Sequence, residues 1–177
     1  MEFTKIQVEN KLIESIDRYF KTYEWINRGF GDGSTNNQKI GLLGEVVIYK
    51  LLMGMYPNLR NRKSGFDAGF DIEYKNKLID VKTMERKCYI TPTFVNNFYA
   101  TQENYKADTI IFCSYHSVDN VLELCGWIPK TELIIKGKYF EKGNQRMRSD
   151  GSFLTLKEDN YEIENKYLYD INTLINN

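Results

Sequence analysis

The chain has 177 residues, about the length of one domain and enough to bury a hydrophobic core. Its 24 Lys and Arg residues are balanced by 24 Asp and Glu residues, so attraction to a nucleic acid would have to come from local patches and not from the net charge. No apolar run approaches the roughly 18 residues that cross a bilayer, and the N-terminus lacks the pattern of a secretory leader. These features argue against a membrane protein and against export.

The first predicted element is an amphipathic helix over residues 4–27, because apolar side chains recur there at helical spacing among charged ones. A loop rich in Gly, Ser and Asn follows, without the Gly-Lys-Ser/Thr of a phosphate-binding loop. One of Ser34, Thr35 and Asn37 is expected to cap the next helix, over residues 38–54. This second helix is apolar almost all round, which favours burial against a sheet.

The middle of the chain is predicted to be rich in strands. After a hairpin over residues 70–82, we expect a third extended piece near 87–95 and a polar helix or loop over 96–106. Two apolar stretches, residues 109–115 and 122–128, are typical of a central strand and its neighbour.

Residues 129–177 form the last predicted part, a basic loop or flap followed by a strand that leads into a short helix. We therefore predict a single domain, with an N-terminal helix, a core over about 38–128 and this C-terminal extension. Cys113 and Cys125 fall within strands and are expected in the core. The three cysteines have no metal-finger spacing and fit reduced thiols in the cytoplasm, or in a host cell's cytoplasm if the chain is phage-encoded.

The predicted hairpin carries two aspartates. Apolar and polar residues alternate on either side of Lys75 and Asn76, so one face is apolar and the other polar. If these two residues form the turn, Asp71 and Asp80 lie directly opposite each other, with Cβ atoms about 4.5 to 5.5 Å apart. A different loop length would change this register.

Two carboxylates so close together repel each other unless a positive charge lies between them. A divalent cation such as Mg²⁺ takes oxygen ligands and would serve. Lys82, on the same strand face as Asp80, is placed to contact water near such an ion. Glu45 adds a carboxylate on the apolar second helix, where a buried charge needs a partner, and Gly41 and Gly44 should let this helix approach the sheet closely.

Glu45 on a helix, Asp71 on a strand and Asp80-Val81-Lys82 on the next strand occur in an order that resembles the PD-(D/E)XK nuclease superfamily. The resemblance covers roughly residues 38–128. It implies a restriction-endonuclease-like fold, an α/β protein with a mixed sheet flanked by helices and a site at the open edge of the sheet. Small phage nucleases and Holliday junction resolvases are the members that the chain resembles most.

The resemblance also implies roles for these residues. Asp71 and Asp80 would bind Mg²⁺, for which Mn²⁺ would substitute, and the backbone carbonyl of Val81 would join them. Glu45 would complete the site directly or through water, and Lys82 would orient or activate the nucleophilic water.

Two features depart from the family pattern. No proline precedes Asp71, and Asp80 stands where many members have Glu. Asp67, in the near-duplicate GFDAGFD, is a rival for the first metal ligand; we prefer Asp71 because it precedes the cleanly alternating strand. Gln102 lies where some members use a glutamine.

Basic residues occur just before the hairpin and in the C-terminal extension. Either group would contact phosphates of a nucleic acid or would simply be solvated, and both readings are open. The candidates for contact with DNA are Arg60, Arg62, Lys63, Lys138, Lys142, Arg146 and Arg148.

These observations lead to two hypotheses. The first is a Mg²⁺-dependent endodeoxyribonuclease that hydrolyses phosphodiester bonds in branched or distorted duplex DNA, as a homodimer. The second is a noncatalytic nucleic-acid-binding or assembly protein that retains the nuclease fold. Chemistry of the catalytic-triad kind has no support, because His116 is the single histidine and is expected at the surface.

Overall fold

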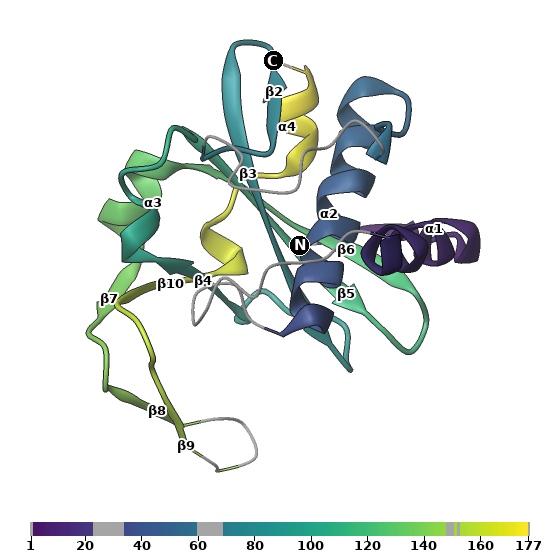
Figure 1. Ribbon diagram of the computed structural model, residues 1–177. Helices are drawn as coiled ribbons and strands as arrows, with labels where there is room; N and C mark the ends of the chain where they lie inside the picture. Colours follow the sequence, from purple (N-terminus) through teal and green to yellow (C-terminus); the bar gives the residue numbers. More distant parts are fainter. Residues whose placement is uncertain (1, 23–33, 60–68, 148–150, 152, 177) are drawn as a thin grey trace.

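A computed structural model describes residues 2–22, 34–59, 69–147, 151 and 153–176. Five strands form its main sheet, in the order β1-β6-β5-β3-β2 (Figure 1). β3 and β5 are parallel, and the other neighbours are antiparallel. The bounds are β1 Thr4–Gln7, β2 Ile72–Tyr74, β3 Lys77–Arg86, β5 Thr109–His116 and β6 Val121–Pro129.

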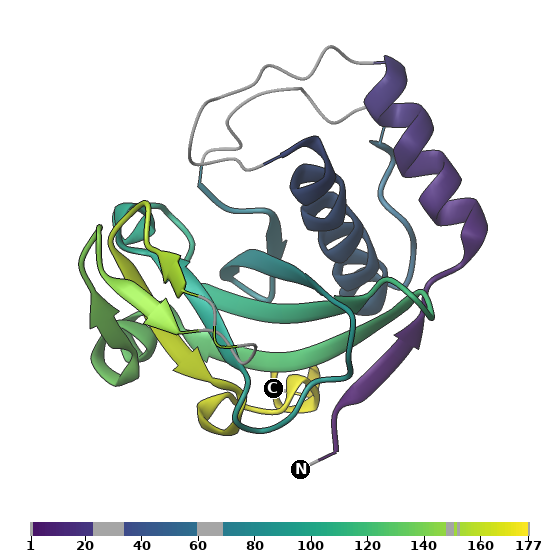
Figure 2. The same ribbon diagram turned by 90° about the horizontal axis from the view of Figure 1, so that it is seen from below.

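Two helices cover one face of this sheet (Figure 2). α2, residues Thr35–Met53, packs on β3, and α1, residues Asn10–Thr22, packs on α2. Ser34 caps α2 by accepting a hydrogen bond from the N–H of Asn37, which confirms one of the three predicted caps. Burial of the second helix against a sheet is also confirmed, since eight of its residues are buried.

The first predicted helix begins later than its pattern indicates. Residues 4–7 are a strand that pairs with the edge of β6, and the helix starts only at Asn10. Residues 23–27 of the prediction lie outside the described residues. Strand pairing prevails over the helical spacing here because a sheet edge is available to satisfy the backbone of this segment.

A second, three-stranded sheet covers the opposite face of the main sheet, in the order β4-β10-β7. Phe98 of this sheet packs with Phe112 and Ile128 of the main sheet in a second hydrophobic core. The chain is therefore a mixed α/β protein with apolar layers on both faces of the main sheet. The bounds are β4 Val95–Tyr99, β7 Lys138–Phe140, β10 Asn160–Glu164 and α3 Lys130–Lys136.

The prediction of a polar helix or loop over 96–106 is wrong for its first part. Residues 96–99 belong to β4, and only the short 3-10 helix η2, Ala100–Gln102, follows. Asn96 belongs in the strand because it is buried and donates a hydrogen bond to Asn165 Oδ1 at 2.7 Å. The extended piece expected near 87–95 overlaps the strand only at Val95.

The C-terminal extension is more ordered than a basic loop. β8, Gln145–Met147, and β9, Phe153–Thr155, pair as a separate two-stranded sheet, called the arm below, which projects from the molecule (Figure 1). The predicted strand and short helix at the end are confirmed as β10 and α4, Ile171–Asn176, with the 3-10 helix η3, Asn165–Tyr167, between them.

Three single-residue expectations can be compared with the structure. Cys113 and Cys125 are buried and unpaired, as predicted, whereas His116 is buried and not at the surface. The imidazole of His116 stacks on the ring of Tyr89, with 4.5 Å between the ring centroids. The residues next to His116 in the sequence do not predict this contact. Among the described helices, none has the length and apolar character to cross a bilayer.

Candidate active site at the open edge of β3

The predicted hairpin turn is present. Lys75 and Asn76 have φ angles of 46° and 62°, the left-handed pair that a two-residue type I′ turn requires. Ile72 then pairs with Ile79, and the pairing of β2 with β3 stops there, so the direct juxtaposition of Asp71 with Asp80 stays a prediction. Asp71 itself lies just before β2, and its backbone N–H donates to the carbonyl of Ile79 at 2.8 Å.

β2 covers only the first part of β3, so the edge of β3 is open from Asp80 onward within the described chain. The carboxylate of Asp71 continues the ladder there, because its Oδ2 accepts a hydrogen bond from the N–H of Val81 at 2.7 Å. The carbonyl of Val81 faces the same edge, since both backbone groups of a strand residue point the same way.

Asp80 and Lys82 lie on the face of β3 that turns away from α2. Ile79 and Val81 point into the core shared with α2, so the alternating positions point to the other face. Lys82 Nζ is 2.8 Å from Asp80 Oδ2, and the two side chains are only 26% and 12% exposed. This ion pair is therefore largely shielded from water.

Glu45 lies on α2, which packs on the opposite face of β3, and its charge nevertheless acts on Lys82. A Cβ on Gly44 would overlap Oγ1 of Thr83 and lie 2.9 Å from Thr83 Cβ, so only glycine permits this approach of helix and strand. The expectation of a close approach is confirmed for Gly44 and wrong for Gly41, whose Cβ would meet no atom of the described residues within 4 Å. Glu45 is the residue that follows the contact.

Neighbouring charges influence the pKa of Lys82. Burial lowers the pKa of the Lys82 ammonium, but the charges of Asp80, Asp71 and Glu45 and the hydrogen bond to Asp80 raise it, and the net pKa lies above its ordinary value. Lys82 is therefore a cation at neutral pH that donates hydrogen bonds. Lys82 is thus paired with Asp80, and the charges of Asp71 and Glu45 also act on its ammonium.

The donor chemistry here fits a hard divalent cation. Three carboxylates and one ammonium have a formal charge of −2, and every candidate ligand is an oxygen atom, including the Val81 carbonyl. In the described part of the chain, however, no three His, Cys, Asp or Glu side chains lie close enough together to hold a metal ion. Metal ligation by Asp71, Asp80, Val81 and Glu45 thus stays a prediction.

Sequence reasoning missed Thr83. Its Oγ1 is buried without a hydrogen-bond partner among the described residues, against the backbone of α2 at Gly44. Thr83 follows Lys82 and lies on the opposite face, so it sets the spacing between the helix and the strand. Gly44 in an apolar helix indicated a close contact with the sheet, but the sequence does not identify Thr83 as the strand residue in that contact.

The predicted contacts with DNA are placed less favourably. Lys142 Nζ lies 3.6 Å from Glu158, and Arg146 donates to both carboxylate oxygens of Glu162, at 3.0 and 2.5 Å. Lys138 is exposed on β7, with its Nζ 5.0 Å from the centroid of the Phe140 ring. The other candidates, together with the rival ligand Asp67, lie outside the described residues; they are Arg60, Arg62, Lys63 and Arg148.

Gln102 lies in η2 and is half-buried. Its Oε1 is buried and has no hydrogen-bond partner in the described part of the chain. The weak assignment of this residue to the site stays a prediction.

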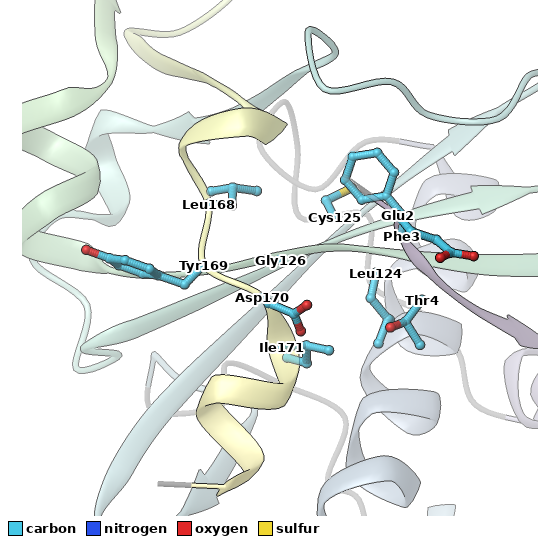
Figure 3. Close-up of a pocket in the computed structure, with 10 residues that line it drawn as sticks. All are labelled: Glu2, Phe3, Thr4, Leu124, Cys125, Gly126, Leu168, Tyr169, Asp170 and Ile171. Carbon is cyan, nitrogen blue, oxygen red and sulfur yellow. The ribbon is translucent and has the colours of Figure 1, made fainter.

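A cavity of about 170 Å³ lies elsewhere, between the start of β1, β6 and the chain before α4 (Figure 3). Gly126 forms part of its wall, with Leu168 and Tyr169 on one side and Phe3 on the other. None of the acids described above lines it, and neither does Lys82. The candidate site is therefore the open edge of β3 and not this cavity.

A comparison of the chain with protein-family models finds no match, and comparisons with curated proteins and with solved structures find none either.

Proposed function

We propose that the protein is a metal-dependent endonuclease that hydrolyses phosphodiester bonds in DNA, with a core of the restriction-endonuclease-like kind. One observation carries the proposal. The ammonium of Lys82 lies 2.8 Å from Asp80, and the carboxylates of Asp71 and Glu45 are close enough to raise its pKa. A helix and two consecutive strands supply these groups in the order that the PD-(D/E)XK resemblance implies.

Asp71 and Asp80 would hold Mg²⁺ or Mn²⁺ together with the Val81 carbonyl, and Glu45 would complete the site directly or through water. A bound divalent cation polarises a phosphoryl oxygen and supplies hydroxide at neutral pH. The fold itself would hold Asp80 and Lys82 in place, because their strand β3 is paired with β5 and packed against α2. Rigid support of this kind keeps reacting groups in place.

Lys82 acts in this proposal as a donor. Because its pKa is raised, its ammonium is protonated at neutral pH and cannot take a proton from water. It would instead orient the attacking water or hold a phosphate oxygen as negative charge develops. Asp80 aims the ammonium, since the ion pair fixes the end of an otherwise flexible side chain.

The second hypothesis, a noncatalytic nucleic-acid-binding protein, has its own support. Asp71 already serves as a cap for the N–H of Val81, and Asp80 is already paired with Lys82. Both aspartates therefore have structural uses that need no metal. Only the response to metal separates the two hypotheses.

The test uses plasmid, four-way junction and single-stranded DNA, each incubated with the purified protein and Mg²⁺, Mn²⁺ or chelator. The enzyme hypothesis expects cutting that requires the metal and disappears in Asp80→Asn. Glu73→Gln is the matched control, because Glu73 is an exposed acid of the same hairpin. DNA binding without cutting of any substrate at either metal would exclude the nuclease and favour the binding protein.

A further inference from the structure

Lys130, the first residue of α3, holds a loop with its ammonium. Its Nζ donates hydrogen bonds to the backbone carbonyls of Glu103 and Tyr105, at 2.7 and 2.5 Å. Its backbone N–H donates to the carbonyl of Asp108 at 2.8 Å. Hydrogen bonds from a charged donor are stronger than those between neutral groups, and Lys130 is half-buried, which limits competition from water. Residues 103–108, called the clamp loop below, are therefore fastened to the start of α3.

The clamp loop is also bonded to the strand that carries Asp80 and Lys82. The N–H of Asp108 donates to the carbonyl of Leu78 at 2.8 Å, and the N–H of Leu78 donates to Asp108 Oδ2 at 3.2 Å. Leu78 lies in β3, two positions before Asp80. These reciprocal hydrogen bonds fix the clamp loop relative to the candidate site.

The clamp loop contacts, in addition, the segment that leads into Asp71. The N–H of Ala107 donates to the carbonyl of Gly69 at 2.9 Å. Gly69 has a φ angle of 84°, and a Cβ there would lie 3.1 Å from both Tyr105 Cβ and the backbone nitrogen of Lys106. Only glycine permits this approach without strain. Because Gly69 is two positions before Asp71, the clamp loop limits where the chain before Asp71 can lie.

Asp71 depends on such support because it lies outside the ladder between β2 and β3. That ladder ends where Ile72 pairs with Ile79. Asp71, one position earlier, is held by the hydrogen bond from its N–H to the carbonyl of Ile79 and by the one that its Oδ2 accepts from Val81. A change in the path of the preceding chain would therefore move this carboxylate relative to Asp80.

We propose that Lys130 is a positioning residue for Asp71. It acts through the clamp loop and Gly69, and it contacts neither the metal nor the DNA. The inference rests on the proposed function for the use of Asp71 as a metal ligand, whereas the placement of Asp71 by Lys130 does not depend on that function. Residues that hold a metal ligand in place commonly change metal affinity by about 10- to 100-fold when they are replaced.

Amide hydrogen exchange at Val81 tests the placement of Asp71 without a metal. This N–H donates to the Asp71 carboxylate, so its protection reports whether the carboxylate keeps its position. Lys130→Met keeps a long side chain but removes the ammonium, and exchange at Val81 should become faster by about tenfold or more. Exchange at Ile111, in the buried strand β5, should change only as much as the global stability does. Unchanged exchange at Val81 relative to Ile111 would overturn the proposal.

A second variant tests the same path if Lys130→Met folds poorly. Gly69→Ala keeps Lys130 but pushes the chain away from the clamp loop, so it should also speed exchange at Val81, and normal exchange there would contradict the proposal. Lys136→Met is the matched control, because Lys136 lies on the same helix and pairs with Glu132 at 2.6 Å. This control should leave Val81 as in the wild type. Exchange as fast as in Lys130→Met would show that the effect is not specific to the clamp loop.

Calorimetric titration with Mn²⁺ separates this inference from the proposed function. If Asp71 is a metal ligand, Lys130→Met should bind Mn²⁺ about tenfold more weakly than the wild type, and Lys136→Met should bind it normally. Wild-type affinity for Mn²⁺ in Lys130→Met would overturn its role at the metal site. A wild type that binds no Mn²⁺, together with faster exchange at Val81 in Lys130→Met, would exclude the metal-dependent nuclease and still support the placement of Asp71 by Lys130.

Discussion

The open edge of β3 and the base of the arm both contain ion pairs, but the two regions arrange their charges differently. At the edge, the ammonium of Lys82 pairs with Asp80 and is also influenced by the charges of Asp71 and Glu45. In the arm and its base, Arg146 and Lys142 each meet a carboxylate of their own. The edge of β3 thus brings several acids near one cation, whereas at the arm each cation has its own acid.

The two regions also differ in how they contact the rest of the fold. Lys82 lies on the long strand β3, which is paired with β5. The next residue, Thr83, is in close contact with Gly44 of α2. The arm contacts β10 through the guanidinium of Arg146. Catalysis needs the first kind of support.

Lys82→Met should have the greatest effect. It removes the ammonium but keeps a long apolar side chain, so the cleavage rate should fall by about 10²–10³-fold, the usual cost of losing one preorganised donor. Binding of Mn²⁺ to the acids should persist in a calorimetric titration. Lys87→Met, at an exposed position beyond β3, is the control and should cleave normally. A normal rate in Lys82→Met would remove the lysine from the mechanism.

Two substitutions at Asp71 separate its structural and electrostatic roles. Asp71→Asn keeps an oxygen that accepts the Val81 N–H but loses the charge, so it should lower cleavage and leave the free energy of unfolding nearly unchanged. Asp71→Ala also leaves that N–H without a partner and should lower the free energy of unfolding by about 1–3 kcal/mol. Urea denaturation checks the stability of both variants. Equal loss of stability in the two would show that the hydrogen bond contributes little.

Gly44→Ala and Gly41→Ala form a matched pair on one helix. At Gly44 the new methyl group meets Thr83, so α2 must shift, and we expect a loss of about 1–3 kcal/mol in the free energy of unfolding together with lower cleavage. Gly41 has open space, and alanine there should stabilise the helix by up to about 1 kcal/mol. Thermal unfolding of both variants would show the opposite signs, and a neutral Gly44→Ala would mean that the helix and strand are less tightly packed.

The basic residues should give the smallest effects. Arg146→Gln breaks an ion pair whose arginine is 36% exposed, so it should cost less than about 1 kcal/mol of stability and should not change the salt dependence of DNA binding. Lys138→Gln removes an exposed cation and should reduce the slope of log affinity against log salt by about 1 if this residue contacts a phosphate. Fluorescence anisotropy at several salt concentrations measures both. A larger change for Arg146 than for Lys138 would reverse the comparison.

Much of the site was predictable because its determinants are local. The turn at Lys75 and Asn76 sets the hairpin register, and strand alternation then puts Asp80 and Lys82 on one face. A small residue in an apolar helix indicated the approach of Glu45. The hydrogen bond from Val81 to Asp71 was not predictable, because it depends on β2 beginning only at Ile72, which leaves the Asp71 side chain to accept from the strand edge.

The wrong predictions concern residues whose structure is determined by contacts with distant parts of the chain. Asn96 resembles a loop residue until Asn165, far along the chain, accepts its hydrogen bond. His116 resembles a surface residue until Tyr89 stacks on it. Residues 4–7 resemble the start of a helix until the edge of β6 is available to them. In each case a tertiary contact outweighs a local preference that is worth only a fraction of a kcal/mol per residue.

The N-terminal strand has a consequence for how the protein is made. Thr4 pairs with Leu124, 120 positions later, so β1 leaves the ribosome long before its neighbour in the sheet exists. At synthesis rates of about 5–20 residues per second, the delay is roughly 6–24 s. During that time β1 has no partner strand and the apolar side of α1 is uncovered. The nascent chain then needs protection from aggregation, which a chaperone would provide.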